Sequence, residues 1–209
     1  MNSEFSKLLG DNIYIRKETV EKNQVIYQAN DRASGFYFLE LGMVGLYKVT
    51  EKGKEHLIRV YGAGEYFGYR SLFSNEHYHL TTRSLQPSTF QHIHASGLNA
   101  IYQHAPDLVQ LLVTSVCREL GEAENRLSNI AAFDAKIRVL DSIVELFGRF
   151  EDYPWTSREI AEYSGTETQT VIRLCKQLKY KNLLNPNIRG VKPVDLRLLK
   201  NYRADLVKN

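Results

Sequence analysis

The chain has 209 residues, 43% of them hydrophobic, and its formal net charge at pH 7 is +3. Such a length permits one or two domains with an ample core. No apolar run after a basic start indicates a signal peptide, and no stretch approaches the roughly 18 apolar residues that a membrane span needs. Neither a secreted protein nor a membrane protein is therefore expected.

The two cysteines, Cys117 and Cys175, lie far apart and outside any CxxC spacing. This arrangement argues against a disulfide framework, a zinc ribbon and a cysteine-bound iron–sulfur cluster. We therefore expect a reducing, cytoplasmic setting.

Residues 1–105 are predicted to form a β-roll. After a mixed lead-in to about residue 20, with one expected helical turn, residues 23–93 contain short segments rich in β-branched and aromatic residues. Gly, Asn and Asp separate these segments at close intervals, where turns would fall. This texture favours an antiparallel sandwich or roll.

Residues 106–133 are predicted to form one long helix, because apolar residues recur there at spacings of three and four. So long and narrow a stripe favours a coiled-coil-like seam in a homodimer. Packing against the chain's own roll would account for the first turns but less well for the last. The stripe consists of Leu108, Leu112, Val116, Leu120, Ala123, Leu127 and Ile130.

A new domain, residues 134–209, is predicted to begin after a hinge at Phe133. Asp134 is suited to cap a helix N-terminus, and the apolar pattern after it predicts a helix over residues 135–150. The helices that follow have a more specific pattern.

A helix-turn-helix is predicted next. Thr156 and Glu159 match a capping box, and Gly165 can adopt the left-handed turn that ends the first helix. Thr166 and Gln169 match a second capping box. The second helix has a polar, basic outer face, which suits a recognition helix in the DNA major groove, although an ordinary helical hairpin shows the same pattern. Its buried stripe is formed by Val171, Leu174 and Leu178.

Basic residues concentrate on this part of the chain. Between Gly165 and Arg203 there are nine Lys or Arg against two acidic residues, a net charge of +7. Between Met1 and Phe133 there are 13 basic and 14 acidic residues, a net charge of −1. Such an asymmetry is expected where a protein contacts DNA phosphates.

Turn signals at residues 185–187 and 189–190, beside short apolar segments, predict a β-hairpin wing after the second helix. Taken in order, the predicted elements give an α+β fold. It has an N-terminal antiparallel β-roll, a long dimerisation helix and a C-terminal winged helix-turn-helix.

Over nearly its whole length the chain resembles the family of bacterial transcription regulators named for the cyclic-AMP receptor protein and FNR. The most specific matches are the G-A-G-E-Y-F-G motif at residues 62–68, like the family's G-x-G-E-x-x-G, the helix-turn-helix at residues 156–178 and the wing beginning at Arg189. The resemblance implies a cyclic-nucleotide-binding-like roll and a homodimer on near-palindromic double-stranded DNA, with half-sites about 10 bp apart. It also implies RNA polymerase as a partner.

The residues that hold cyclic AMP in this family are replaced here. In family members that bind cyclic AMP, a Glu contacts the ribose, an Arg-Ser pair binds the cyclic phosphate, and two hydroxyls of the dimer helix contact the purine. Alignment through Glu65 of the roll motif puts Tyr69 at the ribose position. We therefore expect no binding of cyclic AMP, and the aromatic roll interior is either filled or an apolar ligand pocket. The other positions fall on His79, Leu80, Ala123 and Glu124.

No metal or other cofactor is expected. The first cysteine is Cys117, so the cysteine cluster of the family's oxygen-sensing branch is missing. His77 with His79, and His92 with His94, would each share a strand face and could bind a metal as in cupin enzymes. No acid is placed to complete such a set, so surface histidines are the better interpretation, and a haem is harder to exclude.

In the best-known family members an Arg, a Glu and a second Arg on the recognition helix read the half-site. Those positions are Thr168, Gln169 and Arg173 here. Arg173 can form the forked bond to guanine, Gln169 favours adenine, and Thr168 can meet a thymine methyl. We predict a half-site that keeps one G and is richer in A·T. Phosphate contacts are expected from Thr156, Ser157, Arg158, Lys176, Arg189 and Lys192.

No pairing of a nucleophile with a base suggests an enzyme. The chain is therefore predicted to be a sequence-specific DNA-binding regulator. Two alternatives remain, a metal-dependent cupin-type β-roll protein and a sensor that acts through protein contacts. The basic C-terminal segment counts against both.

Overall fold

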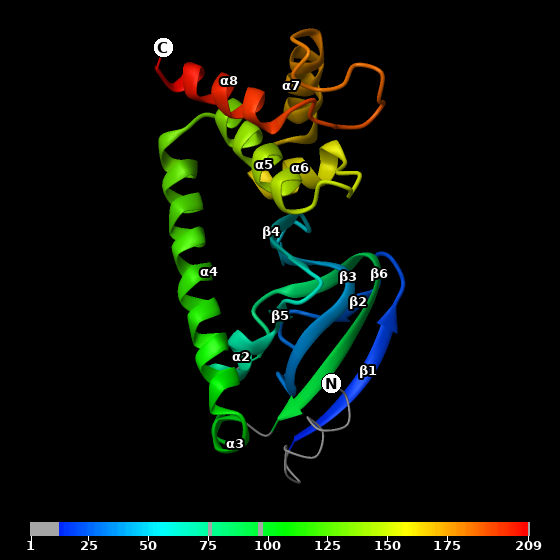
Figure 1. Cartoon of the computed structure of the whole chain (residues 1–209), viewed down its shortest axis with the longest axis vertical. Coiled ribbons are helices and arrows are strands. Elements are labelled where there is room, and N and C mark those ends of the chain that lie inside the picture. Colours follow the sequence, from blue (N-terminus) through cyan, green and yellow to red (C-terminus); the bar gives the residue numbers. More distant parts are fainter. Residues whose placement is uncertain (1–12, 75–76, 96–97, 209) are drawn as a thin grey trace. The chain divides into compact units, whose positions relative to one another are not determined.

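A computed structural model describes residues 13–74, 77–95 and 98–208 (Figure 1). The chain forms two compact units, with their boundary between Ala123 and Glu124. The first unit contains the predicted antiparallel β-roll, and the second contains the predicted helix-turn-helix. The helical turn expected in the lead-in lies outside the described residues.

The roll is one antiparallel sheet of six strands, as the closely spaced apolar segments predicted. Neighbouring strands follow the order β1-β6-β3-β4, while β2 pairs with β6 and β5 pairs with β3. The strands are β1 (Ile13–Val20), β2 (Val25–Tyr27), β3 (Gly35–Val49), β4 (Glu55–Gly62), β5 (Tyr66–Phe67) and β6 (Thr81–Ala95).

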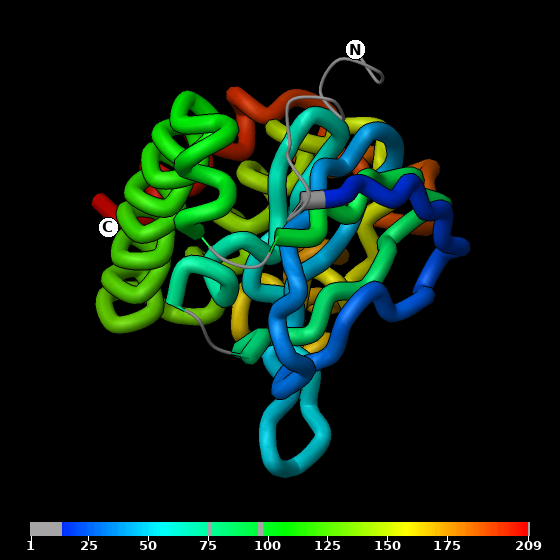
Figure 2. Tube along the Cα trace, turned by 90° about the horizontal axis from the view of Figure 1, so that it is seen from below, coloured from blue at the N-terminus to red at the C-terminus, as the bar shows by residue number. Residues whose placement is uncertain are grey.

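The two longest strands, β3 and β6, shift register between Leu39 and Val44. Gly42 lies in this irregular stretch with a φ of 96°. A Cβ at this position would come within 2.3 Å of Ser88 Oγ, so the close approach of the strands requires glycine. Further along, the turn at residues 50–54 projects from the roll (Figure 2).

Two clusters of buried side chains stabilise the roll. One is aromatic and includes Tyr37, whose ring stacks on Phe67 with centroids 4.9 Å apart. The other joins the sheet to α2 (Tyr69–Phe73), α3 (Leu98–His104) and the start of α4. Its buried members are Phe36, Tyr69, Leu72, Ile93, Ala95, Ile101, Leu108 and Leu112.

Helix α4 (Pro106–Ala132) packs its apolar side chains against the roll in its first turns, and Glu119 contacts the roll farther along the helix. Leu112 is fully buried there, and Val116 packs against the same cluster. The prediction that Leu112 faces a partner is therefore corrected, because it belongs to the roll's own core. Val116 is only partly buried, so its predicted partner contact stays a prediction. Farther along the helix, Leu120 is 57% exposed and Leu127 is 68% exposed.

The second unit packs α5 (Ala135–Arg149), α6 (Ser157–Ser164), α7 (Thr168–Tyr180) and α8 (Leu196–Lys208) around a common core. The predicted cap at Asp134 is confirmed, since its side chain accepts a hydrogen bond from Ile137 N at 3.0 Å. The buried core includes Leu140, Ile143, Trp155, Ile160, Val171, Leu178, Leu184 and Leu199.

The last turns of α4 belong to this second unit. The Arg126 guanidinium lies over the Tyr163 ring, 4.1 Å from its centroid, and donates to Tyr163 O at 2.7 Å. The Tyr163 hydroxyl donates to Glu145. This contact set, the Arg126 clasp, joins the end of α4 to α6 and α5.

The predicted β-hairpin wing is reduced to a single bridge between Leu184 and Pro193. Asn185 N donates to Lys192 O at 2.8 Å beside it, but no strand forms among these described residues. The two apolar strands predicted there were wrong.

Helix α8 is found where the second strand of the wing was predicted. The sequence analysis did not predict this helix. Leu196, Leu199 and Tyr202 recur at nearly helical spacing, which favours a helix over a strand. Arg203 fixes α8 to α5 through two hydrogen bonds to Asp141, at 2.8 and 3.0 Å. No helix among the described residues has the length and apolar character to cross a bilayer.

Candidate nucleic-acid interface and roll pocket

A complete capping box fixes the start of α6, as predicted. Thr156 Oγ1 accepts from Glu159 N at 3.1 Å, and the Glu159 carboxylate accepts from Thr156 N at 2.8 Å. Thr156 Oγ1 also donates to that carboxylate at 2.7 Å. The Thr156 hydroxyl hydrogen is therefore already used, which weakens its prediction as a phosphate contact.

The turn between α6 and α7 is built on Gly165, which has the predicted left-handed conformation with φ 65°. The second predicted capping box was wrong. Helix α7 begins at Thr168 with Glu167 as its N-cap, and no side chain caps it. Thr166 is buried instead, and its hydroxyl lies 2.9 Å from that of Ser164.

Helix α7 has the two-sided character expected of a recognition helix. The predicted stripe of Val171, Leu174 and Leu178 is buried. Gln169 and Arg173 are exposed in its first turns, and Thr168 is half-buried beside them. Cys175 is also buried, and burial raises the pKa of its thiol to about 11, so it is unreactive at neutral pH.

The predicted phosphate-binding residues differ in their surroundings. Arg158 pairs with Glu162 at 2.7 Å, and Lys192 donates to Glu151 O at 3.1 Å. Ser157 is half-buried in the first turn of α6. Lys176 and Arg189 are exposed.

Internal ion pairs also reduce the basic charge that this part of the chain presents to a partner. Arg197 pairs with Asp195 at 2.8 Å, and Arg203 pairs with Asp141 of α5. Both arginines counted toward the net charge of +7. The charge available to a partner is therefore carried mainly by α7 and the loop that follows it.

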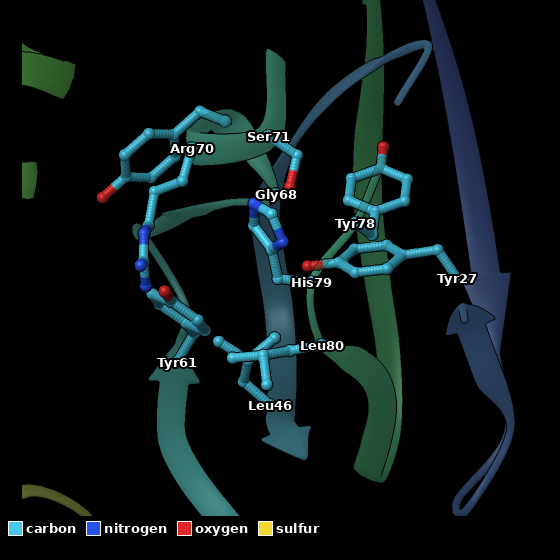
Figure 3. A pocket seen from close by; sticks show the side chains of 10 residues that line it. Tyr27, Leu46, Tyr61, Gly68, Arg70, Ser71, Tyr78, His79 and Leu80 are labelled. Atoms are coloured by element: carbon cyan, nitrogen blue, oxygen red, sulfur yellow. The ribbon is translucent and has the colours of Figure 1, made fainter. Parts of the chain in front are cut away.

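The roll contains a hollow of about 380 Å³, part of it open to solvent (Figure 3). Three of the residues aligned with the family's effector site, Tyr69, His79 and Leu80, are among its lining residues. Glu65 and the α4 residues Ala123 and Glu124 are not among the lining residues. The Glu65 carboxylate instead accepts a hydrogen bond from Gly62 N at 2.7 Å.

Two pocket residues, Arg70 and Ser71, were missed in the sequence. Both belong to α2, directly after the roll motif, and both line the hollow. The family alignment places the anion-binding residues nine positions later, at His79 and Leu80, so it drew no attention to Arg70 and Ser71. The remaining lining residues are Tyr27, Leu46, Tyr61, Gly68 and Tyr78.

A buried carboxylate on α4 bonds to two of the tyrosines that line the hollow. Glu119 is 5% exposed and accepts from the Tyr61 and Tyr69 hydroxyls at 3.2 and 2.8 Å. Arg59 lies beside it, with Nη2 donating to the Glu119 backbone O at 3.0 Å, Nε 3.8 Å from the carboxylate, and Nη1 paired with Glu122. Burial and the adjacent Glu119 carboxylate raise the pKa of Tyr69 above its ordinary value. This Tyr–Glu–Tyr bridge holds α4 against the roll.

The paired histidines of β6 lie against each other. The rings of His92 and His94 are 3.6 Å apart, and Nδ1 of His92 lies 3.6 Å from Glu18. Burial lowers the pKa of His92 to about 4. No group of three or more His, Cys, Asp or Glu side chains that could hold a metal occurs in the part of the chain that the structure describes.

Comparison with known proteins agrees with this architecture. Residues 17–105 match the family model of the cyclic nucleotide-binding domain. An uncharacterised protein of Haemophilus influenzae is 37% identical over 108 residues, which cover 52% of this chain and 84% of that protein.

The match extends to regulators over more of the chain. The fumarate and nitrate reduction regulatory protein of Yersinia pestis is 24% identical over 184 residues, covering 84% of this chain and 73% of that protein. A CRP/FNR-family transcriptional regulator from Thermus thermophilus has the same fold, with a TM-score of 0.74, 20% identity, and coverage of 90% of this chain and 98% of that one. The chain belongs to the CRP/FNR family. In this CRP/FNR regulator, the cyclic nucleotide-binding domain is the β-roll, and α6 with α7 is the helix-turn-helix.

Proposed function

We propose that this CRP/FNR regulator binds a specific double-stranded DNA sequence as a homodimer and does not respond to cyclic AMP. The main support for DNA binding is the surface of α7, where Gln169 and Arg173 are exposed on the side opposite a buried stripe. A helix displayed in this way can enter a major groove. We also propose that it acts with RNA polymerase rather than as an enzyme, since its relatives are named as regulators.

The exposed residues of α7 predict which bases are read. Arg173 can donate two bonds to the O6 and N7 of one guanine. Gln169 matches the N6 and N7 of adenine, and Thr168 can contact a thymine methyl. The proposed half-site keeps one G and is otherwise rich in A·T.

Selection from a random duplex pool at about 150 mM salt tests this proposal, because non-specific binding is weak under such conditions. We expect a palindrome with half-sites about 10 bp apart. Arg173→Ala should relax the preference at one G, with a cost of about 1–3 kcal/mol. Lys176→Ala is the matched control, since a phosphate contact should weaken all sequences equally. Failure to enrich any sequence from folded dimer would contradict the proposal.

The dimer proposal rests on a second, exposed seam of α4. Val113, Cys117, Leu120 and Leu127 recur at spacings of four, three and seven, and all are exposed. Such spacing matches the a and d positions of a coiled coil. This seam is offset from the stripe that the sequence predicted, and it shares with it only Leu120 and Leu127. Ile130, the last member of the predicted stripe, is 50% exposed and lies beside its end.

Cys117 provides a direct test of this seam. In a parallel symmetric dimer the two copies of Cys117 face each other, so mild copper–phenanthroline oxidation should give a reducible covalent dimer. Cys175 is buried and serves as the internal control, since the Cys117→Ser variant should give no such product. Oxidation that leaves the wild-type protein monomeric would contradict a parallel dimer through this seam.

The proposed lack of response to cyclic AMP rests on the pocket. Tyr69 aligns with the ribose-binding Glu of the family, and its hydroxyl is already bonded to Glu119. No lining residue comes from α4, which supplies the purine contacts in the family. Isothermal titration should therefore show no binding of cyclic AMP. A dissociation constant for cyclic AMP of about 1–10 µM would contradict this part of the proposal.

A further inference from the structure

The C-terminal end of α6 is held by arginines from two other helices. Nη2 of Arg126, near the end of α4, donates to Tyr163 O at 2.7 Å, and Nη2 of Arg138 on α5 donates to Gly165 O at 3.4 Å. The last carbonyls of a helix have no partner inside the helix, and positive side chains beside them are favourable. Both arginines therefore bind the backbone at the turn between α6 and α7.

Arg126 is the stronger of these two anchors. Its guanidinium lies over the Tyr163 ring, 4.1 Å from the centroid, while it also donates to the Tyr163 carbonyl. A flat guanidinium that stacks and donates at once loses little entropy for each hydrogen bond that it forms. The bond from Arg138 is longer, and Nε of Arg138 is buried without a hydrogen-bond partner among the residues that the structure describes.

The start of α7 depends on the turn that these arginines bind. No side chain caps α7, and its first buried residue is Val171. Gln169 and Arg173, the proposed base-reading residues, are exposed beside it. A side chain reads a base edge only in a narrow range of positions, so a shift of about 1 Å at the start of the helix would be enough to lose the contact.

We propose that Arg126 and Arg138 are positioning residues for base reading. They hold the turn at Gly165 so that the first turns of α7 keep one direction, and they do not contact DNA themselves. The effect on base reading rests on the proposed function. The anchoring of the turn does not, and it is tested on the protein without DNA.

Hydrogen exchange followed by mass spectrometry tests the anchoring on the full-length protein. Arg126→Met keeps much of the side chain's length and removes its donors. Amides of residues 170–174 should exchange about 10-fold faster in this variant, because loss of one charge-assisted bond has an effect of this size. Arg138→Met should have a smaller effect in the same residues. If Arg126→Met leaves their exchange as slow as in the wild type, the inference is wrong.

Arg203→Met is the matched control. The Arg203 guanidinium also lies over an aromatic ring, 4.8 Å from the Phe133 centroid, and also donates to a residue of α5, Asp141. It fixes α8 and not the turn, so its loss should speed exchange in α8 and leave residues 170–174 unchanged. Equal acceleration of residues 170–174 in both variants would indicate a general loss of stability and would overturn the inference.

Binding to the selected palindrome and to a scrambled duplex tests the consequence for base reading. Arg126→Met should bind the palindrome about 10-fold more weakly and the scrambled duplex as tightly as the wild type does. The slope of log K against log salt should not change, because no phosphate contact is lost. Equal weakening on both duplexes with a smaller slope would make Arg126 a phosphate contact and refute its positioning role. If the wild type prefers neither duplex, the proposed function fails, and hydrogen exchange still decides whether the arginines anchor the turn.

Discussion

Two leucines of α4 separate the helix into a part that packs on its own roll and a part that we propose meets a partner. Leu112 is fully buried, and Leu127 is 68% exposed. We predict that Leu112→Ala lowers the stability of the roll without changing dimer affinity. Leu127→Ala should do the reverse.

The expected magnitudes follow from burial. Leu112→Ala removes a fully packed side chain and should cost about 2–5 kcal/mol of unfolding free energy. Leu127→Ala should cost a monomer less than about 0.5 kcal/mol, because the side chain faces solvent there. If two copies of Leu127 are buried in a dimer, their loss should cost about 2 kcal/mol or more, and the dissociation constant should rise about 30-fold or more.

Sedimentation equilibrium measures the dissociation constant, and urea unfolding measures the stability. Leu111→Ala is the matched control, because Leu111 is 50% exposed on the same helix but lies about 160° around the axis from the proposed seam at Val113. If Leu127→Ala and Leu111→Ala change the dissociation constant equally, the seam is placed on the wrong face. If Leu112→Ala leaves the roll as stable as before, the burial argument fails.

Three other perturbations test the interior. His92 has a pKa of about 4 in the fold against about 6.5 when unfolded, so the unfolded chain binds more protons and stability falls as pH drops from 6.5 to 4. Urea titrations should show that the unfolding free energy of the wild type falls by about 2 kcal/mol between pH 7 and pH 5. The His92→Gln variant should lack this part of the fall. Glu119→Leu should cost about 2–5 kcal/mol, because it leaves the Tyr61 and Tyr69 hydroxyls without their buried acceptor, and stability equal to the wild type would refute that role. Arg203→Ala should lower the unfolding free energy by about 1 kcal/mol, measured by thermal unfolding. If the same substitution costs as much in a variant that already lacks Asp141, the Arg203–Asp141 pair is not the cause.

Local signals in the sequence predicted the order of elements and several of their ends. Thr156, Asp134 and Gly165 act within a few residues of themselves, so their spacing is enough to locate a cap or a turn. Thr166 shows the limit of this reasoning. Its capping pattern competed with a buried contact to Ser164, and burial decided the outcome.

Features that depend on contacts between residues far apart in the chain were harder to predict from the sequence. An apolar stripe does not say whether it meets its own roll or another chain, so Leu112 and Leu127 received the same prediction. Likewise, alignment follows positions in the chain, whereas the pocket collects side chains by their place in space. Arg70 and Ser71 reach it from α2, and two of its tyrosines bond to Glu119 of α4.

The Arg126 clasp determines where the second unit can be joined to a different roll. Because Arg126 and Tyr163 contact each other across the expected hinge, the compact unit that carries α7 starts near Glu124 and not at Asp134. A chimera joined at Asp134 would pair a foreign helix end with Tyr163 and lose the clasp. A junction before Glu124 would carry the matched partners together, so lineages that recombine these modules should preserve the last turns of α4 with the domain that follows.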